Sequence, residues 1–393
     1  MNKVTIQEEK SLNITTDNSI TSVNGVYESK GVTNTASNGA NKVNADDTAA
    51  ILTLSSNGDS DGVVNVKRTS SNFNLYASDI NNVLSILKSQ GYYNGPSCGF
   101  VSNEAKIAIK KFEKDYGMKE TGELTETVYD RILTVDSLLK NKEMQTQLTK
   151  LGFYDGDKKH IFKALQNFQK LYGLTENGKY NNATKSMLTR VYNDYNKLYN
   201  SETMNTISKE LYHDEAQKDA FIKVYIFLKT GMNLSPNQIA GVMGNMHAES
   251  AILPDNVQEG TCPGEHNRGA YIFDENDEET GFGILQWTNS VRKKELKKMA
   301  QEMAFNSSAE AVDNALWDLN VQLAYFKREM TTKIDGLTDY SKAWNKIKST
   351  YSYSYNDVSD IFLKDIESPT NLESKKEDRR KLSKIIYDAL IKL

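Results

Sequence analysis

The chain has little cysteine and little histidine. Its 393 residues include two cysteines and four histidines. Cys98 and Cys262 fall in different predicted domains, so we expect two free thiols rather than a disulfide. The histidines show no second motif at ligand spacing, which disfavours a zinc amidase, and we expect no metal and no cofactor. A cysteine peptidase built from Cys262 with His247 or His266 is disfavoured too, because Cys262 lies in a predicted loop away from any helix start that would lower the pKa of its thiol. We expect His247 to be a packed or capping residue.

The chain also lacks long apolar runs and a strong charge of either sign. No segment approaches the roughly 20 apolar residues that cross a bilayer, and residues 1–20 have no apolar core typical of a signal peptide. We therefore expect no membrane span, and synthesis in the host cytoplasm without a secretion signal. The formal net charge of −4 disfavours a nucleic-acid partner. Lysines alternate with acidic residues over residues 292–298 and 375–381, where we expect solvated helix faces.

Large apolar residues are scarce in the first 75 positions, which are rich in Asn, Ser, Thr, Gly and Asp. This composition is typical of a flexible arm or of short strands ordered by a partner. Residues 49–54 and 63–66 are candidate strands. We interpret residues 1–75 as an anchor that docks to an assembly; disorder is the alternative.

An internal repeat begins after the arm. The segment around Gly91 recurs around Gly152, an offset of 61 residues, and the segment from Ala108 to Gly122 recurs at an offset of 56. Each copy has the pattern of three helices separated by glycine turns. We place the copies at residues 76–136 and 137–200.

The repeat resembles the peptidoglycan-binding repeat of cell-wall hydrolases, a three-helix bundle. That resemblance implies bacterial peptidoglycan as a partner. The first copy has Glu113 where the second has Gln169, the more usual type, which puts wall binding by the first copy in doubt.

One helix of the C-terminal third ends in a carboxylate. Ser235, Pro236 and Gln238 form a helix start with a polar cap, a first-turn proline and a third-position glutamine. The next apolar residues recur at helical spacing and define a buried face: Ile239, Val242, Met243 and Met246. Glu249 continues this face, so we expect its carboxyl group to be held among apolar neighbours and its pKa to be raised. A raised pKa suits a general acid at neutral pH.

A glycine-rich segment, residues 280–287, lies downstream of this helix. Gly281 and Gly283 permit close backbone approach to a ligand. Gln286 offers a donor and an acceptor to sugar groups, and Trp287 offers a flat apolar face. We expect this segment to form the wall of a sugar-binding groove.

These two motifs, residues 239–250 and 281–288 with Arg292 after them, resemble the phage tail lysozyme family within the lysozyme-like superfamily. The resemblance covers residues 210–393. It implies that Glu249 protonates the glycosidic oxygen and that Gln286 and Trp287 contact substrate. Gly283 and Ser250, which belong to the same motifs, are further candidate substrate-binding residues.

A second carboxylate is usually needed for glycoside hydrolysis. Acidic residues crowd the turn of a predicted β-hairpin between residues 271–273 and the strand that enters Gly281, and Asp274 and Glu279 flank that turn. Either is a candidate, although a solvated turn is the common role of such residues. With no second carboxylate, a lytic transglycosylase remains open, in which the substrate's own hydroxyl attacks.

The sequence thus predicts a multidomain, mainly α protein. A lysozyme-like α+β catalytic domain with a small β-hairpin comes after two three-helix repeats and the polar arm. We expect a muramidase that cleaves the β-1,4 bond between N-acetylmuramic acid and N-acetylglucosamine, carried on a virion tail or phage-like particle or released as an endolysin. The alternatives are an inert tail or wall-adhesion protein with a lysozyme-like domain, and a lytic transglycosylase.

Overall fold

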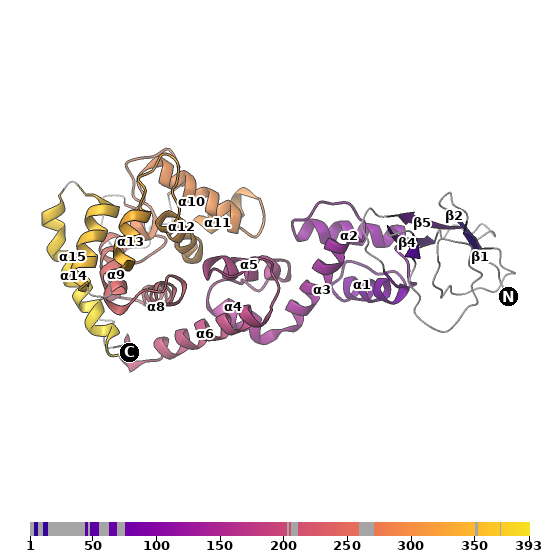
Figure 1. Ribbon diagram of the computed structural model, residues 1–393, viewed down its shortest axis with the longest axis horizontal. Coiled ribbons are helices and arrows are strands. Elements are labelled where there is room, and N and C mark those ends of the chain that lie inside the picture. The colour runs from indigo at the N-terminus through magenta and orange to yellow at the C-terminus, as the bar shows by residue number, and fades with distance from the viewer. Residues whose placement is uncertain are drawn as a thin grey trace. The chain divides into compact units, whose positions relative to one another are not determined.

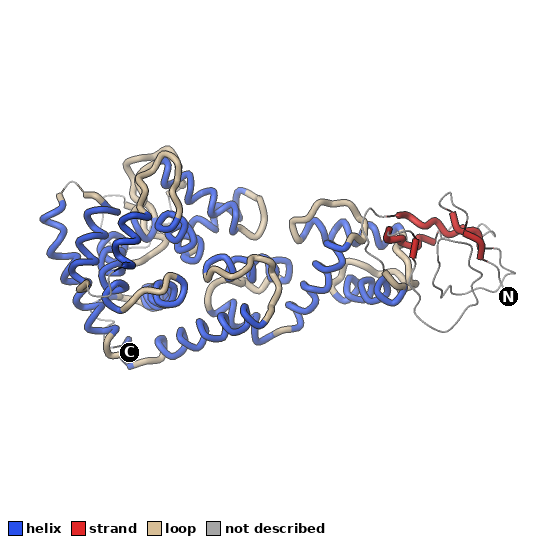
Figure 2. The backbone as a smooth tube through the Cα atoms, in the orientation of Figure 1, coloured by secondary structure: helices blue, strands red, loops and turns tan. Residues whose placement is uncertain are grey.

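The computed structural model describes residues 75–393, apart from residue 203 and residues 206–210, 259–270, 350–352 and 370. Of the first 74 residues it describes only the backbone of five short strands. The chain divides into two compact units, Met1–Lys140 and Asn141–Leu393 (Figure 1). Helices dominate both (Figure 2), which confirms the mainly α class. No described helix is long and apolar enough to cross a membrane.

The strands of the first unit form one antiparallel sheet of order β1-β2-β5-β4-β3. Their bounds are Val4–Ile6, Ser11–Ile14, Asn44–Ala45, Thr48–Leu54 and Val63–Arg68 for β1 to β5. Strands β4 and β5 pair with Leu52 opposite Val66. The expectation of short strands at residues 49–54 and 63–66 is thus confirmed.

The first repeat consists of α1 (Ala77–Ser89), α2 (Asn103–Asp115) and α3 (Glu126–Lys140). The apolar positions predicted for its first helix are buried: Ile80, Val83, Leu84 and Leu87. Gly91 comes just after α1 with a φ of 85°, a left-handed conformation that only glycine adopts readily.

The second repeat consists of α4 (Lys142–Lys150), a short 3-10 turn (Lys158–His160), α5 (Ile161–Leu171) and α6 (Asn182–Tyr199). Glu113 and Gln169 hold equivalent loops in the two repeats. A carboxylate oxygen of Glu113 accepts from the Gly122 N–H at 2.7 Å, and the amide oxygen of Gln169 accepts from the Gly178 N–H at 2.8 Å. Both side chains are buried, so Glu113 and Gln169 act on the loops within their repeats rather than at the surface.

The C-terminal lobe, residues 211–393, is built from helices. They are α8 (Glu215–Ile226) with a π-helical extension (Phe227–Gly231), α9 (Pro236–Ser250), α10 (Ser290–Met303), α11 (Ala309–Leu316), α12 (Leu319–Thr331), α13 (Ser341–Ser349), α14 (Tyr355–Phe362) with a π-helical turn η4 (Leu363–Glu367), and α15 (Leu372–Leu390). Trp317 and Trp344 are buried, which confirms them as core residues.

Helix α9 packs directly against α14 and α15. Two glycines make this close approach possible. A Cβ on Gly241 would lie 2.6 Å from Cβ of Val358, and one on Gly244 would lie 2.8 Å from the backbone nitrogen of Ser383. Both distances are shorter than carbon contacts allow, so larger residues would push α14 and α15 away from α9.

The predicted β-hairpin is wrong. Residues 271–273 form no strand, Ile272 is 87% exposed, and Phe282 forms an isolated bridge with Val257 instead. The acidic side chains explain the difference, because they take the backbone donors that a ladder would use. Asp274 accepts from the Asn276 N–H at 2.9 Å, and Asp277 accepts from the Glu279 N–H at 2.9 Å.

The second repeat and the C-terminal lobe lie in the same compact unit and are joined by hydrogen bonds. The Asn167 amide donates to the Met303 carbonyl at 2.7 Å, and the Asn320 amide donates to the Leu151 carbonyl at 3.3 Å. The Lys327 ammonium donates to the Leu171 carbonyl at 2.9 Å.

Candidate active site

Helix α9 begins and ends where the sequence predicts. Ser235 and Gln238 form the capping box, in which the Gln238 amide oxygen accepts from the Ser235 N–H at 2.8 Å. The predicted apolar face is buried: Ile239, Val242, Met243 and Met246. Glu249 lies in the last turn of α9, one residue before its end, with its side chain 18% exposed. The carboxyl group is therefore held at the margin of the core rather than in open solvent.

Two side chains from distant segments reach Glu249. The Arg379 guanidinium, from α15, donates to one Glu249 carboxylate oxygen, and the same nitrogen lies 3.3 Å from a carboxylate oxygen of Glu367. Glu367 is the last residue of the π-helical turn η4. We refer to Glu249 and Glu367 as the carboxyl pair.

Glu367 is the more buried member of the pair, with a side chain 9% exposed. Burial raises the pKa of Glu367 well above its usual range, and the nearby Glu249 carboxylate raises it further, while Arg379 opposes the shift. One carboxylate oxygen of Glu367, Oε1, is buried without a hydrogen-bond partner among the described residues. Burial and the neighbouring carboxylate therefore favour the protonated form of Glu367.

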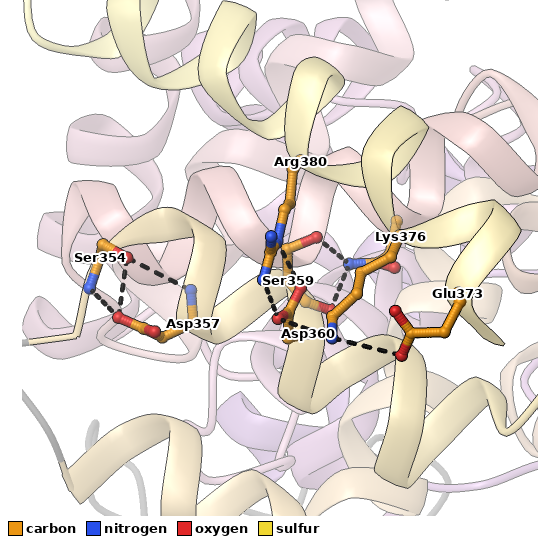
Figure 3. A network of polar contacts seen from close by, with 8 residues as sticks. Ser354, Asp357, Ser359, Asp360, Glu373, Lys376 and Arg380 are labelled. Atoms are coloured by element: carbon orange, nitrogen blue, oxygen red, sulfur yellow. Dashed lines mark hydrogen bonds and ion pairs between the residues drawn. The ribbon is translucent and has the colours of Figure 1, made fainter.

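The burial of Arg379 contradicts one prediction made from the sequence. Residues 375–381 were expected to form a solvated face, but Arg379 is buried and pairs with both carboxyl groups. More exposed side chains lie on the neighbouring face of α15. There Arg380 binds Asp360 of α14 through two nitrogens, and Lys376 lies 3.5 Å from Asp360 and 3.6 Å from Glu373 (Figure 3). This network ties α15 to α14 beside the carboxyl pair.

The prediction of a solvated helix face at residues 292–298 is wrong at its first two positions. Arg292 binds Glu329 through two nitrogens at 2.6 and 2.9 Å, and Lys293 is buried with its ammonium group on the Asp277 carbonyl. Arg292 therefore ties α10 to α12, and Lys293 ties α10 to the loop that contains Asp277. Both cations have partners because an unpaired buried charge is costly.

The two motifs meet directly behind Glu249. The Ser250 hydroxyl donates to the Ile284 carbonyl at 3.0 Å. The Asn256 amide donates to the Ser250 carbonyl, and the Gln286 amide donates to the Asn256 carbonyl, each at 3.2 Å. Ser250 and Asn256 therefore fasten the end of α9 to the glycine-rich segment. Ser250 is buried, so it is a positioning residue here rather than a substrate contact.

Backbone strain gathers at the same place. Ala251, Ile252 and Gln286 adopt φ values of 52°, 65° and 45°, in the left-handed region that side chains with a Cβ avoid. Each such residue costs on the order of 1–3 kcal/mol and persists only where the surrounding contacts impose it. Strain at three residues next to Glu249 is typical of a functional site.

The glycine-rich segment differs from the predicted groove wall. Trp287 is fully buried, packs against Tyr325 and directs its indole nitrogen toward Glu329. Gly283 is buried too, and a Cβ there would lie 2.5 Å from the Gln322 amide oxygen. Both residues belong to the core, because the segment folds inward onto α12 rather than along a groove. Gln286 is half-buried, and its amide nitrogen is used by backbone carbonyls.

The two predicted second carboxylates lie in the exposed turn. Asp274 and Glu279 are both exposed, while Glu275, Asp277 and Glu278 between them bind residues of α10. The structure brings Glu367, not these residues, to Glu249.

Sequence reasoning missed both Glu367 and Arg379. Glu367 lies four residues after Leu363, and Arg379 precedes the buried residues Ser383 and Ile386 by four and seven. The helical-spacing argument used for Glu249 also predicts that Glu367 and Arg379 continue buried helix faces. The many charged residues around them in the sequence obscure this spacing.

The zinc-amidase and cysteine-peptidase alternatives depend on the histidines and the two cysteines. The His247 ring lies 2.5 Å from the Leu211 carbonyl, and burial lowers its pKa. Cys98 is a free, exposed thiol, whereas Cys262 and His266 lie outside the described residues. No group of three or more described metal-ligating side chains is arranged to hold an ion.

Two known protein families match parts of the second unit. Residues 219–390 match the phage tail lysozyme family, and residues 141–188, the second repeat, match the putative peptidoglycan binding domain family. No curated protein and no solved structure matches the chain. These matches confirm the resemblance carried by the motifs and support a lysozyme-like function in cell-wall lysis. The chain thus combines a segment that matches the peptidoglycan-binding family with a C-terminal domain that matches the phage tail lysozyme family.

Proposed function

We propose that the C-terminal domain cleaves the β-1,4 bond between N-acetylmuramic acid and N-acetylglucosamine, with Glu249 as the proton donor. The observation that carries this proposal is the carboxyl pair on a buried guanidinium at the end of α9, in which burial raises the pKa of Glu367. Glu249 is the more exposed member and is the one that can reach a glycosidic oxygen. Glu367 stores the proton between turnovers.

In the reaction, the bond between the sugar C1 and the glycosidic oxygen breaks, and its electron pair goes to the oxygen, which takes the proton from Glu249. The ring carbon becomes oxocarbenium-like. Arg379 stabilises the carboxylate that Glu249 becomes, because charge-assisted hydrogen bonds strengthen as the acceptor gains negative charge. A nucleophile then attacks C1 and returns a proton to the pair.

Replacing Glu249 by Gln tests the proton donor. Glutamine keeps the size and the acceptor oxygen for Arg379 but has no acidic proton, so we expect the fold to survive and the cleavage rate to fall by about 10²–10⁴-fold. Cleavage is measured as turbidity loss of purified wall and as release of new sugar ends. Glu373→Gln, on the exposed face of α15, is the matched control and should keep wild-type activity. Full activity in Glu249→Gln would reject the assignment.

The exposed acidic turn offers the alternative second carboxylate. Under this proposal, Asp274→Asn and Glu279→Gln keep most of the cleavage rate. A loss comparable to that of Glu249→Gln in either variant would move the second catalytic role to the turn.

A second candidate is a lytic transglycosylase. Inverting hydrolases separate their two carboxyl groups by roughly 6.5–9.5 Å to admit water across the sugar ring, whereas one Arg379 nitrogen contacts both Glu249 and Glu367. The pair therefore sits on one side of the bond, which favours attack by the substrate's own hydroxyl. Mass spectrometry of digested wall distinguishes the two reactions, since a transglycosylase leaves anhydro-muramyl ends and a hydrolase leaves reducing ends.

We also propose that the chain works from a phage or phage-like tail, anchored through residues 1–75. The family match and the strand-forming arm support this placement. Particles that carry a chain without residues 1–75 should lose the protein on purification. Its retention would favour another anchor, and its presence only in free form would favour an endolysin. Wall binding without any release of sugar ends would instead favour the inert adhesion protein.

A further inference from the structure

A cavity of about 460 Å³ lies between the second repeat and the C-terminal lobe, within the second unit. It is lined from the repeat side by residues of the turn after α4 and of α5, and from the lobe side by residues 303–321. Its size is in the range of small-ligand sites, which is roughly 300–1,000 Å³. Neither member of the carboxyl pair lines it.

The two walls of the cavity are held together by the hydrogen bonds that join the repeat to the lobe. Asn167 and Asn320 both line the cavity, and both donate across it to backbone carbonyls, of Met303 and Leu151. Both asparagines are buried. The cavity is therefore formed in advance and needs no closing motion to bind a ligand.

One wall is aromatic. The His160 ring stacks on Phe305 with centroids 4.2 Å apart and an interplanar angle of 3°. The orientation of His160 is set by Asp155, whose carboxylate lies 2.7 Å from its Nδ1. Tyr154 and Phe153 continue this surface. Flat apolar faces of this kind bind the methylene chain of a long side chain.

Acidic side chains outnumber basic ones in the cavity lining, where Asp155 already pairs with His160. Its described lining includes the carboxyl groups of Asp155, Glu310 and Asp318 and no lysine or arginine. Asp318 caps α12 by accepting from the Val321 N–H at 3.1 Å, and burial raises its pKa. The Lys223 ammonium opposes this shift, and a cationic ligand would oppose it further, because a nearby positive charge favours the ionised carboxylate.

We propose that this cavity binds the stem peptide of the wall polymer through a protonated primary amine, which lies against Asp318 and Glu310 with its methylene chain along Tyr154 and Phe305. The proposal rests on the proposed action of the chain on peptidoglycan. Its two walls belong to the segments that match the peptidoglycan-binding and lysozyme families. A neutral sugar gains little from three carboxyl groups, whereas the diamino acid of a stem peptide gains a charge partner and an apolar surface.

Calorimetric titration of the full chain tests the proposal. The probes are a muramyl tripeptide that ends in L-lysine and the same fragment with its ε-amine acetylated. We expect acetylation to weaken binding at least 10-fold. Asp318→Asn keeps the helix cap, since Asn caps as well as Asp, and should weaken binding of the free amine about 10-fold; Glu310→Gln, at an exposed position, should weaken it about 3-fold. Asp335→Asn, an exposed change of the same charge outside the cavity, is the control and should leave binding unchanged.

Equal affinity for the two fragments, or Asp318→Asn and Glu310→Gln variants that are folded and bind as tightly as the Asp335→Asn control, would overturn the proposal. Ala311→Phe adds a ring to the cavity lining without altering charge and should abolish binding. The titration reports binding alone and cleavage is scored separately. A chain that binds the amine but cleaves no glycan overturns the proposed function only, and one that cleaves glycan without discriminating the amine overturns this inference only.

Discussion

Glu249 and Glu367 differ in burial although they share one guanidinium, and this difference divides their roles. Two carboxyl groups this close cannot both ionise cheaply, so one proton stays with the pair over a wide pH range. The buried member, Glu367, has the raised pKa. Burial that keeps one carboxyl group protonated is how a site can hold an acid near neutral pH.

Replacing Glu367 by Gln should shift the pH profile of cleavage. Burial and Glu249 raise the pKa of Glu367 to about 8, so the wild-type pair should lose its proton and its activity as pH rises through about 8. Without Glu367 the alkaline limb should move to lower pH. Initial rates between pH 5 and 10 check this, with Glu373→Gln as the control. An unchanged alkaline limb would contradict proton storage by Glu367.

The same substitution has a consequence for stability. The folded-state pKa of Glu367 lies above its unfolded value of about 4.3, so its contribution to stability is fully present below about pH 4 and is lost as pH rises through the folded pKa. Glu367→Gln should therefore raise Tm relative to wild type at pH 9, and the gain should shrink or reverse at pH 5. A Tm difference that does not vary with pH would mean that Glu367 ionises as freely as in the unfolded chain.

Among the elements, α9, α14 and α15 form the frame of the candidate site. Gly241 and Gly244 let α14 and α15 approach α9, and α15 then carries Arg379 to the carboxyl pair. Arg379 and Arg380 are consecutive in sequence but face opposite environments, since Arg379 is buried and the side chain of Arg380 is 44% exposed. The two residues therefore form a matched comparison.

Arg379→Met should lower the free energy of unfolding by about 3–5 kcal/mol, because it leaves the buried Glu367 and the partly buried Glu249 without their cation. Arg380→Met removes an exposed ion pair with Asp360 and should cost about 1 kcal/mol or less. Urea unfolding of both variants at pH 7 measures the difference. Equal losses would show that Arg379 does not compensate the buried pair.

At the scale of the whole molecule, the second repeat and the C-terminal lobe share one compact unit. All three tryptophans, at positions 287, 317 and 344, lie in the lobe, so tryptophan fluorescence reports unfolding of the lobe alone. The Asn167 bond to the Met303 carbonyl reaches the lobe from the repeat.

Asn167→Ala, a change in the repeat, should therefore lower the fluorescence-detected stability of the lobe, by about 1–2 kcal/mol for a buried acceptor left unpaired. Asn193→Ala, at an exposed position of α6 in the same repeat, is the control and should leave the transition in place. A lobe transition insensitive to Asn167→Ala would mean that the repeat and the lobe unfold independently.

Local pattern was enough for much of the architecture. The capping box and apolar spacing of α9 predicted its bounds and its buried face, and the glycine turns predicted both three-helix repeats. These features depend on neighbours within a few turns of the chain. The hairpin prediction failed for a local reason also. Acidic side chains compete for backbone donors, and the apolar run at residues 271–273 carries no information about that competition.

By itself the sequence determined that Glu249 ends an amphipathic helix and that a glycine-rich segment lies downstream of it, because both are properties of short stretches. Only the tertiary structure decided which residues face Glu249. Glu367 and Arg379 lie 118 and 130 positions away from it in the sequence, and no local period links residues so far apart. Burial of Trp287 was decided in the same way, since whether an aromatic ring faces a sugar or the core depends on where α12 packs against it.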